Sequence, residues 1–279
     1  MYKKNYLFHY YIMSNIFFVL LILFLILIFI SFTGKKTKAC NGSSLEKNGY
    51  VLLDMLNEND INYINELWKN KETDKIKHYI HNHVNVHKQL KNQIGNDYVF
   101  QDYVLLIEKS RIHTCHRDFN SPILNKKQKH TSYTIIFYME PMENCLDVID
   151  GSHKHTGIYL TDSTCTVKCR VGQALLFNAS LFHVGSFNEK PDNRRIQMKL
   201  SHYDDIDNIK MYEQYNKTLN KDTKIPQSVI AFQKHMSCQL PVMADLTTTS
   251  KNAETESTFS RMFSQVFYGD SNFYTLDNV

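Results

Sequence analysis

The segment 171–200 constrains the fold of this chain more than any other, because it predicts three short β-strands in succession. Its sequence, VGQALLFNASLFHVGSFNEKPDNRRIQMKL, holds two apolar runs separated by a turn, then a polar loop, then a run in which apolar and polar residues alternate. Alternation with a period of two is typical of a strand with one buried face. His183 ends the second predicted strand, and the pair Arg194 and Arg195 opens the third.

Upstream segments predict further strands at 98–107, 111–118, 132–139 and 164–171. Helical spacing of apolar residues is clearest near the front of the chain, at 60–68. Many short strands at close spacing favour a barrel or a two-sheet jelly roll. We therefore expect a mainly β domain with flanking helices, a double-stranded β-helix of the jelly-roll or cupin-like kind. Apolar residues make up 43% of the chain, enough to fill such a core.

Composition divides the 279 residues into four predicted parts. These are an N-terminal membrane anchor at 1–34, a tether at 35–46, the β domain at 47–210, and a C-terminal extension at 211–279. The extension is predicted to be partly helical, with a helix at 206–219 crossing its boundary, and then loosely ordered, because residues 240–279 are rich in Thr, Ser and Asn.

The predicted anchor is an apolar stretch in which residues 16–30 are unbroken by any polar residue. About 20 apolar residues cross a bilayer as a helix. A cleaved signal peptide is the alternative, but 31–34 is a poor cleavage site, which favours a retained single-pass transmembrane helix. The lipid bilayer is then a partner of the chain. Lysines flank both ends of the stretch, so the side of the membrane that carries the domain stays open.

Charge and cysteines exclude some other classes of protein. The net charge is +4 without a dense basic stripe, so no nucleic-acid partner is expected. The six cysteines include no C-x-x-C, which argues against a zinc ribbon or a thioredoxin motif. Cys165 and Cys169 share a strand face about 13 Å apart and cannot bridge each other. Whether any cysteines pair, and in which redox compartment, stays open.

The candidate catalytic residues are two histidines and an aspartate. His116 and Asp118 form an H-x-D triplet at the end of a predicted strand, where positions i and i+2 face the same way. Together with His183 they would supply two imidazoles and one carboxylate, the ligand set of non-haem Fe(II) oxygenases. A lone histidine is more often a core residue. A second triplet, His202 to Asp204, has no strand-and-arginine pattern after it, and we interpret it as structural.

The order of these motifs resembles the phytanoyl-CoA dioxygenase-like branch of the Fe(II)/2-oxoglutarate-dependent oxygenases, over about residues 45–203. The matching positions are 48–68, His116, Asp118, 150–153, 172–177, His183, Asn188 and Arg194. Asp150 and Gln173 depart from the family pattern, where Pro and Asp are usual.

The resemblance implies roles for these residues. His116, Asp118 and His183 would be the catalytic residues and would hold Fe(II), and Arg194 or Arg195 would bind 2-oxoglutarate. Spacing favours Arg194, as does the strand face that it shares with the alternating apolar residues. Arg195 stays open, because that face could be the outer one.

The implied activity is hydroxylation of a C–H bond with O2, releasing succinate and CO2, with ascorbate as a supporting reductant. The substrate is not predicted and could be a lipid, a small molecule or a protein side chain. Two alternatives remain: a non-catalytic, membrane-tethered β-helix with a relict metal site, and a zinc-dependent cupin-like hydrolase in which Arg194 has no evident function. The oligomeric state is not predicted.

Overall fold

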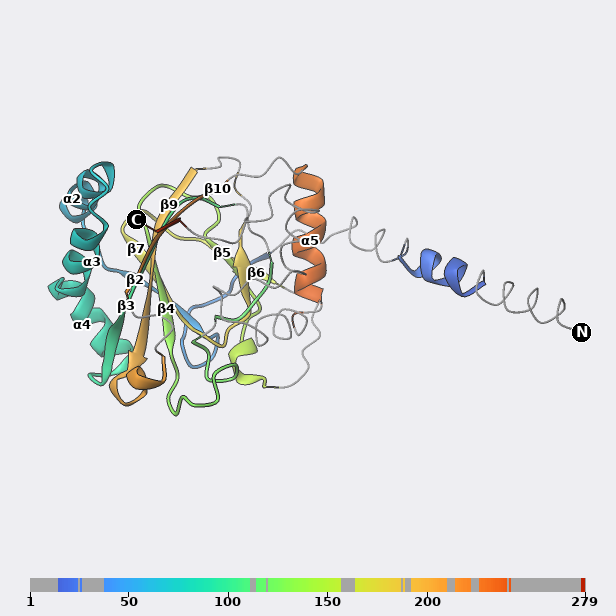
Figure 1. Cartoon of the computed structure of the whole chain (residues 1–279), viewed down its shortest axis with the longest axis horizontal. Helices are drawn as coiled ribbons and strands as arrows, with labels where there is room; N and C mark the ends of the chain where they lie inside the picture. Colours follow the sequence, from blue (N-terminus) through green and yellow to red (C-terminus); the bar gives the residue numbers. More distant parts are fainter. Residues whose placement is uncertain are drawn as a thin grey trace, which may run out of the picture.

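The structure is a computed structural model, and it describes residues 15–24, 26, 38–110, 114–118, 120–156, 164–186, 188, 192–209, 214–221, 226–239, 241 and 277–278. Two β-sheets pack against each other through a shared apolar core (Figure 1). The predicted mainly β, two-sheet architecture with flanking helices is therefore confirmed.

Seven strands of the described residues form the larger sheet. Their order is β11 (Asp277–Asn278), β10 (Tyr215–Lys221), β3 (Tyr98–Ser110), β9 (Asp192–His202), β4 (Tyr133–Tyr138), β7 (Gln173–Asn178) and β2 (Tyr50–Asp54). Neighbours are antiparallel except β10 and β3. Strand β9 lies between β3 and β4, away from the edges of the sheet. Its side chains alternate between the two faces of the sheet, as in any strand.

In the described part of the chain, four short strands form the smaller sheet, in the order β1 (Lys38–Ala39), β6 (Cys165–Val167), β5 (Leu146–Val148) and β8 (His183–Gly185). Its apolar residues pack on the inner face of the larger sheet, where Ile136, Tyr138 and Phe177 lie. The interior between the sheets is thus bounded by β4, β7 and β9 on one side and by β5 and β8 on the other.

Three helices, α2 (Glu58–Lys69), α3 (Thr73–His81) and α4 (Val84–Ile94), cover the outer face of the larger sheet (Figure 1). Helix α2 begins at Asn57, whose side chain accepts hydrogen bonds from the first turn while Asp60 bonds back to the Asn57 amide. The apolar side chains of the helices share one core cluster with the alternating apolar residues of β9. The apolar face of β9 is therefore the outer, helix-covered face.

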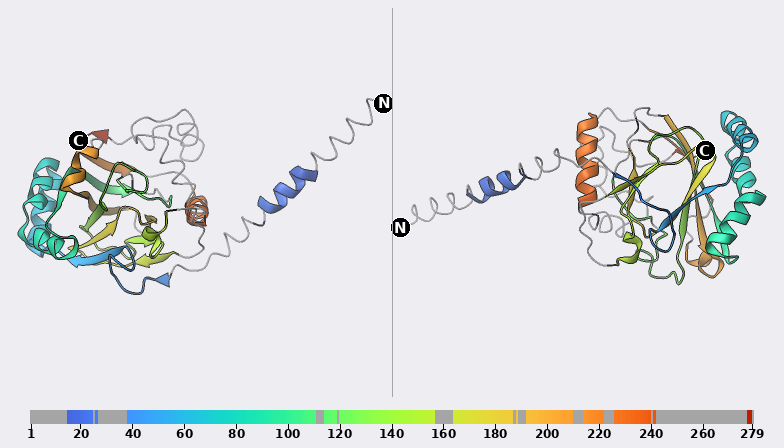
Figure 2. Two further views of the ribbon diagram at one scale, coloured as in Figure 1. Left: turned by 90° about the horizontal axis from the view of Figure 1, so that it is seen from below. Right: turned by 180° about the vertical axis from the view of Figure 1, so that it is seen from behind.

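The helix α5 (Gln227–Gln239) lies on the opposite side of the domain, beside the smaller sheet (Figure 2). The Lys234 ammonium donates to the buried Asp147 carboxylate of β5, and the Cys115 amide donates to Ser237 Oγ at 2.8 Å. The predicted helix at 206–219 is wrong. The chain there forms the 3₁₀ helix η2 (Tyr203–Asn208) and strand β10, because pairing with β3 supplies the backbone hydrogen bonds of 215–221.

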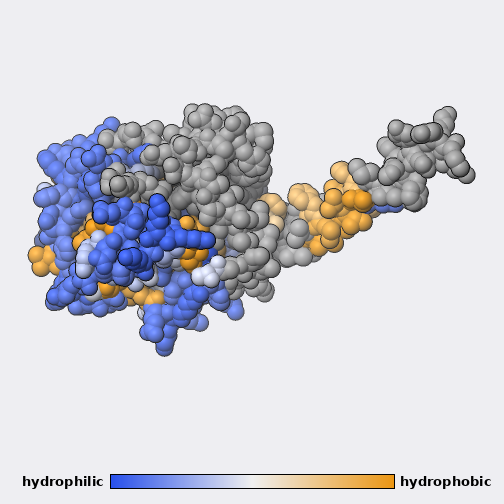
Figure 3. Space-filling model, turned by 60° about the horizontal axis from the view of Figure 1, so that its bottom comes forward, coloured by the Kyte–Doolittle hydropathy of each residue, from blue (hydrophilic) through white to orange (hydrophobic). Residues whose placement is uncertain are grey.

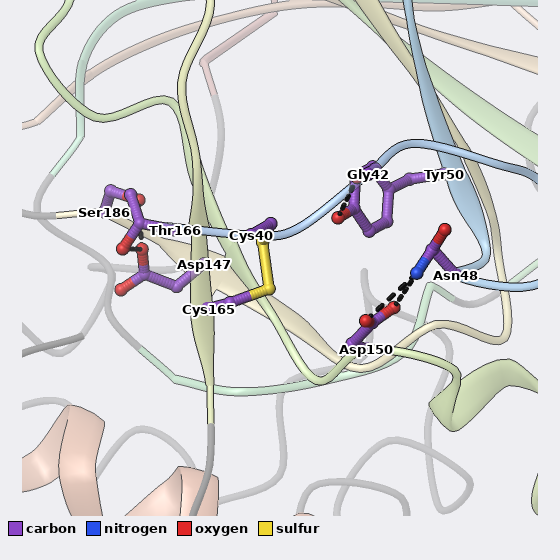
Figure 4. The surroundings of a disulfide bond; sticks show 9 residues. All are labelled: Cys40, Gly42, Asn48, Tyr50, Asp147, Asp150, Cys165, Thr166 and Ser186. Atoms are coloured by element: carbon purple, nitrogen blue, oxygen red, sulfur yellow. Dashed lines mark hydrogen bonds between the residues drawn. A yellow bond between two sulfur atoms is a disulfide. The ribbon is translucent and has the colours of Figure 1, made fainter. Parts of the chain in front are cut away.

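Two disulfides join strands and loops around the smaller sheet, and Figure 4 shows the one between Cys40 and Cys165. Cys40 bonds to Cys165, with 4.8 Å between their Cα atoms, and Cys145 bonds to Cys169, with 6.1 Å. Cys165 and Cys169, which are too far apart on one strand face to bridge each other, therefore each form a disulfide with a different cysteine. Residues 38–40 of the predicted tether are consequently paired with β6 and covalently fixed to it.

Residues 15–24 are helical, and the exposed fraction of their large apolar side chains runs from 41% at Leu21 to 69% at Phe17. Figure 3 shows this helix as strongly hydrophobic. Among the residues that the structure describes, none of the helices combines the length and apolar character needed to cross a bilayer. Most of the predicted anchor, and nearly all of the predicted loosely ordered tail at 240–279, lie outside the described residues.

Candidate metal centre

Backbone pairing brings His116 and His183 together. The amide of each donates to the carbonyl of the other at 3.0 Å, and the Asp118 amide donates to Ala179 O at 3.0 Å. His183 is the first residue of β8 rather than the end of a strand, and the predicted strand at 111–118 is reduced, in its described part, to this single bridge. The bridge nevertheless does what the predicted strand was expected to do, because it places the residues side by side.

The side chains of His116, Asp118 and His183 converge on one spot. One ligand atom from each lies within 4.8 Å of the others, and His183 Nε2 is 4.0 Å from Asp118 Oδ1. The Nδ1 atoms of His116 and His183 lie 2.8 and 3.0 Å from the carbonyl oxygens of Thr114 and Leu181. A carbonyl only accepts, so each Nδ1 carries the proton and each Nε2 keeps its lone pair for a metal. These donors fit a single divalent cation.

Electrostatics keep this donor set ready for a metal at neutral pH. Burial alone would raise the pKa of Asp118, but the Lys199 ammonium and then the two imidazoles hold it at about 2. Burial, helped by the neighbouring His116, lowers the pKa of His183 to about 4. The carboxylate is therefore ionised and the His183 ring neutral, the forms in which both bind metals.

Two neighbours of Asp118 were missed by sequence reasoning. Thr134 Oγ1 of β4 donates to Asp118 Oδ2, and Lys199 Nζ of β9 lies 3.4 Å from Asp118 Oδ1. Thr134 and Lys199 are directly opposite each other in the sheet. The sequence does contain a pattern that points to Lys199, because polar residues alternate along 195–201. This pattern identifies Lys199 as a neighbour of Asp118 only when it is known which face of β9 is the inner one.

The two candidate arginines lie on opposite faces of β9. Arg194 is on the outer face, beside α2, where its Nε donates to Glu140 Oε1 at 2.5 Å. Arg195 is on the inner face, opposite Tyr138 of β4. Arg194 was favoured because it shares a strand face with the alternating apolar residues of β9. That reasoning is wrong, because this face packs under the helices and not around the candidate site.

Tyr138 adds a polar group beside Arg195. Its side chain is fully buried, and its hydroxyl has no hydrogen-bond partner among the described residues. Burial raises the pKa of Tyr138, against the opposing charge of Arg195, so the hydroxyl stays protonated. A buried hydroxyl donor next to a guanidinium suits a carboxylate.

Other matched positions have structural roles. Asn188 Nδ2 donates to Asn144 O at 2.8 Å and its Oδ1 accepts from the Asn144 amide at 2.9 Å, which fixes the loop before β5. Gln173 bonds to Asp54 at the surface. His153 packs against Gly49, where a Cβ would come within 2.5 Å of its Nδ1.

A second cluster combines His130, His202 and Asp204 near the surface. The two imidazoles stack with centroids 3.7 Å apart, and His202 Nδ1 accepts from the Asp204 amide at the start of η2. His130 Nδ1 lies 3.1 Å from the buried Asp205 carboxylate. These bonds give the cluster a structural role in holding η2 against the loop before β4.

Known proteins resemble this chain in structure rather than in sequence. No family model matches the chain, and no curated protein matches it by sequence. Solved structures that are similar to part of this chain include the non-haem α-ketoglutarate-dependent epimerase SnoN from nogalamycin biosynthesis, with 14% identity, a TM-score of 0.44, and coverage of 57% of this chain and 78% of SnoN. The iron- and α-ketoglutarate-dependent endoperoxidase NvfI has 10% identity and a TM-score of 0.43, with 56% and 77% covered. HygX from Streptomyces hygroscopicus, solved with nickel, 2-oxoglutarate and hygromycin B, has 11% identity and a TM-score of 0.41, with 57% and 84% covered.

Proposed function

We propose that this chain is an Fe(II)- and 2-oxoglutarate-dependent dioxygenase of the phytanoyl-CoA dioxygenase-like kind. The observation that carries the proposal is the convergence of His116, Asp118 and His183, with both Nε2 lone pairs left available by the backbone bonds to Nδ1. Two imidazoles and one carboxylate leave open positions on an octahedral metal and suit Fe(II). Arg195, rather than Arg194, is the residue for the distal carboxylate of 2-oxoglutarate.

The residues around the triad have separable roles in this proposal. Thr134 and Lys199 hold the Asp118 carboxylate in place, while Arg195 and Tyr138 offer a guanidinium and a hydroxyl further along the same inner face. Arg195 is paired in the sheet with Tyr138, and Lys199 with Thr134, four residues or about 13 Å apart along the strand. The distal carboxylate would therefore bind away from the metal.

Bound Fe(II), with 2-oxoglutarate, O2 and ascorbate as a supporting reductant, would supply oxidation of a substrate C–H bond, releasing succinate and CO2. Hydroxylation is the outcome we propose, because Asp118 occupies the position that halogenating relatives leave to a small residue. Asp118 and His183 are each 5% exposed, and this burial would limit the access of water to the reacting groups.

We also propose that the apolar N-terminal segment anchors the domain to a membrane. The exposed apolar side chains of residues 15–24 support this, since such a surface is unfavourable in water. The two disulfides favour an anchored domain on the oxidising side of that membrane.

The test is iron-dependent turnover of 2-oxoglutarate by the full chain, followed as succinate. We expect succinate from the wild type and none from His116→Ala, Asp118→Ala or His183→Ala. His202→Ala, in the structural cluster, serves as the matched control and should retain turnover. Succinate formation that survives all three ligand changes would refute the proposal, and a wild type that neither turns over nor gains stability with Fe(II) and 2-oxoglutarate would favour the relict-site alternative.

A further inference from the structure

The inner face of β9 carries a cation that the proposed co-substrate site does not use. Lys199 exposes 3% of its surface, and its ammonium lies 3.4 Å from Asp118 Oδ1 and 3.3 Å from Asn120 Oδ1. Burying an ammonium is costly unless charges and hydrogen bonds compensate. A methionine or leucine would fill this position without that cost, so the lysine suggests a function.

A buried donor without a partner lies beside this ammonium. Asn120 is fully buried, its Oδ1 accepts from Lys199, and its Nδ2 makes no hydrogen bond to any described residue. The same is true of Gln128 Nε2, eight residues further along the same loop. Unpartnered buried amide donors are rare and costly, and each calls for an acceptor.

Polar contacts continue from Lys199 along the inner face of β9. Ser201 Oγ lies 3.0 Å from Ser132 Oγ, which donates to Gln128 Oε1, and Gln101 Nε2 donates to Ser201 Oγ at 2.6 Å. The polar region thus extends past Lys199 in the direction away from Arg195. The loop 120–130 borders it, and this loop carries both unpartnered donors.

A metal ion on Asp118 would change what surrounds the Lys199 ammonium. A divalent cation would share the Asp118 carboxylate with this ammonium, which lies 3.4 Å from Asp118 Oδ1, so less negative charge would compensate the buried lysine. An anionic group beside Lys199 and Asn120 would restore that compensation and accept a hydrogen bond from Asn120 Nδ2.

We propose that Lys199 and Asn120 form an anion-binding corner that holds a carboxylate of the primary substrate next to the metal. This inference rests on the proposed function and narrows its substrate class to molecules with an acidic group close to the oxidised carbon. The carboxylate of 2-oxoglutarate nearest the metal could occupy the same corner. The experiment distinguishes this carboxylate from that of the primary substrate.

The experiment uses the full chain loaded with Mn(II), which is redox-silent, and saturated with 2-oxoglutarate. Acetate is titrated by calorimetry, with acetamide as its uncharged counterpart. We expect acetate but not acetamide to bind the wild type. Loss of a charge-assisted contact should weaken acetate binding by at least about tenfold in Lys199→Met and in Asn120→Asp, which keeps the size of the side chain. Lys127→Met, an exposed lysine of the same loop, is the matched control and should bind acetate as the wild type does.

The outcomes separate the corner from the proposed function. The proposal is overturned if Lys199→Met binds acetate as well as the wild type does. It is also overturned if acetate does not bind the wild type, and loss of 2-oxoglutarate by Lys199→Met would then assign the corner to the co-substrate. If no variant or wild type binds 2-oxoglutarate, the proposed function fails, while acetate titrated onto the Mn(II) form alone still measures the corner.

Discussion

Arg194 and Arg195 are neighbours in the sequence, yet the sheet gives them unrelated surroundings. Arg194 pairs with Glu140 on the outer face, and Arg195 lies inside, opposite Tyr138. Period-two alternation tells which residues share a face of β9 but not which face the helices cover. That information comes from the packing of α2, α3 and α4, which a single strand does not contain.

Arg195→Met should therefore weaken 2-oxoglutarate binding to the Mn(II)-loaded chain by at least about tenfold, through loss of a bidentate charged contact. Arg194→Met removes the same charge one residue away and should leave this affinity unchanged. Calorimetric titration of both variants gives the comparison. Equal weakening by the two, or an effect of Arg194→Met alone, would contradict the assignment.

For Lys199 we predict that removing the charge strengthens binding of a ligand, here Mn(II), instead of weakening it. Its charge lies close to the Asp118 carboxylate and opposes a divalent cation there. Lys199→Met should therefore bind Mn(II) alone more tightly than the wild type, in a titration without 2-oxoglutarate. Unchanged or weaker Mn(II) binding by a variant that still folds would contradict this opposition of charges.

Helices and strands that are determined by nearby residues could be predicted from the sequence. Helix α2 has a capping residue and apolar residues at helical spacing, and β4 is rich in β-branched and aromatic residues. The segment 206–219 was mispredicted because its strand depends on pairing with β3, more than 100 residues away in the chain. The interior placement of His116 depends likewise on a single bridge to His183, which no local pattern reveals.

Helix α5 supplies a prediction about stability. Its Lys234 pairs with Asp147, which is 2% exposed and also accepts from Thr166 and Ser186. Lys234→Met leaves a buried carboxylate without its cation and should lower the free energy of unfolding by about 3 kcal/mol. Lys69→Met breaks an exposed pair with Glu66 and should cost less than about 1 kcal/mol. Denaturant unfolding measures both, and equal costs would contradict a buried role for Lys234.

At the scale of the whole molecule, the disulfides link segments that lie far apart in the sequence and meet only at the smaller sheet. Cys40 and Cys165 are 125 residues apart in sequence, and their bond fixes the start of the folded domain to β6. Sequence alone could exclude a bond between Cys165 and Cys169 from their spacing, but the correct partners become neighbours only when the smaller sheet forms.

Thiol counting tests this arrangement. In the denatured, unreduced chain, four cysteines should resist alkylation, and Cys115 and Cys238, which are buried in the fold and belong to neither disulfide, should react. Reduction should destabilise the domain by about 2–5 kcal/mol for each bond lost. Six reactive cysteines in chain isolated without reductant would contradict both bonds and the oxidising environment proposed for the domain.

The central claim is that His116, Asp118 and His183 together hold one divalent metal ion, and equilibrium binding of Mn(II) tests it most directly. The stoichiometry should be one ion per chain in the wild type and in His202→Ala, and binding should be lost in Asp118→Ala while its far-ultraviolet circular dichroism stays that of the wild type. Undiminished Mn(II) binding by Asp118→Ala, or loss of binding only in His202→Ala, would contradict the account.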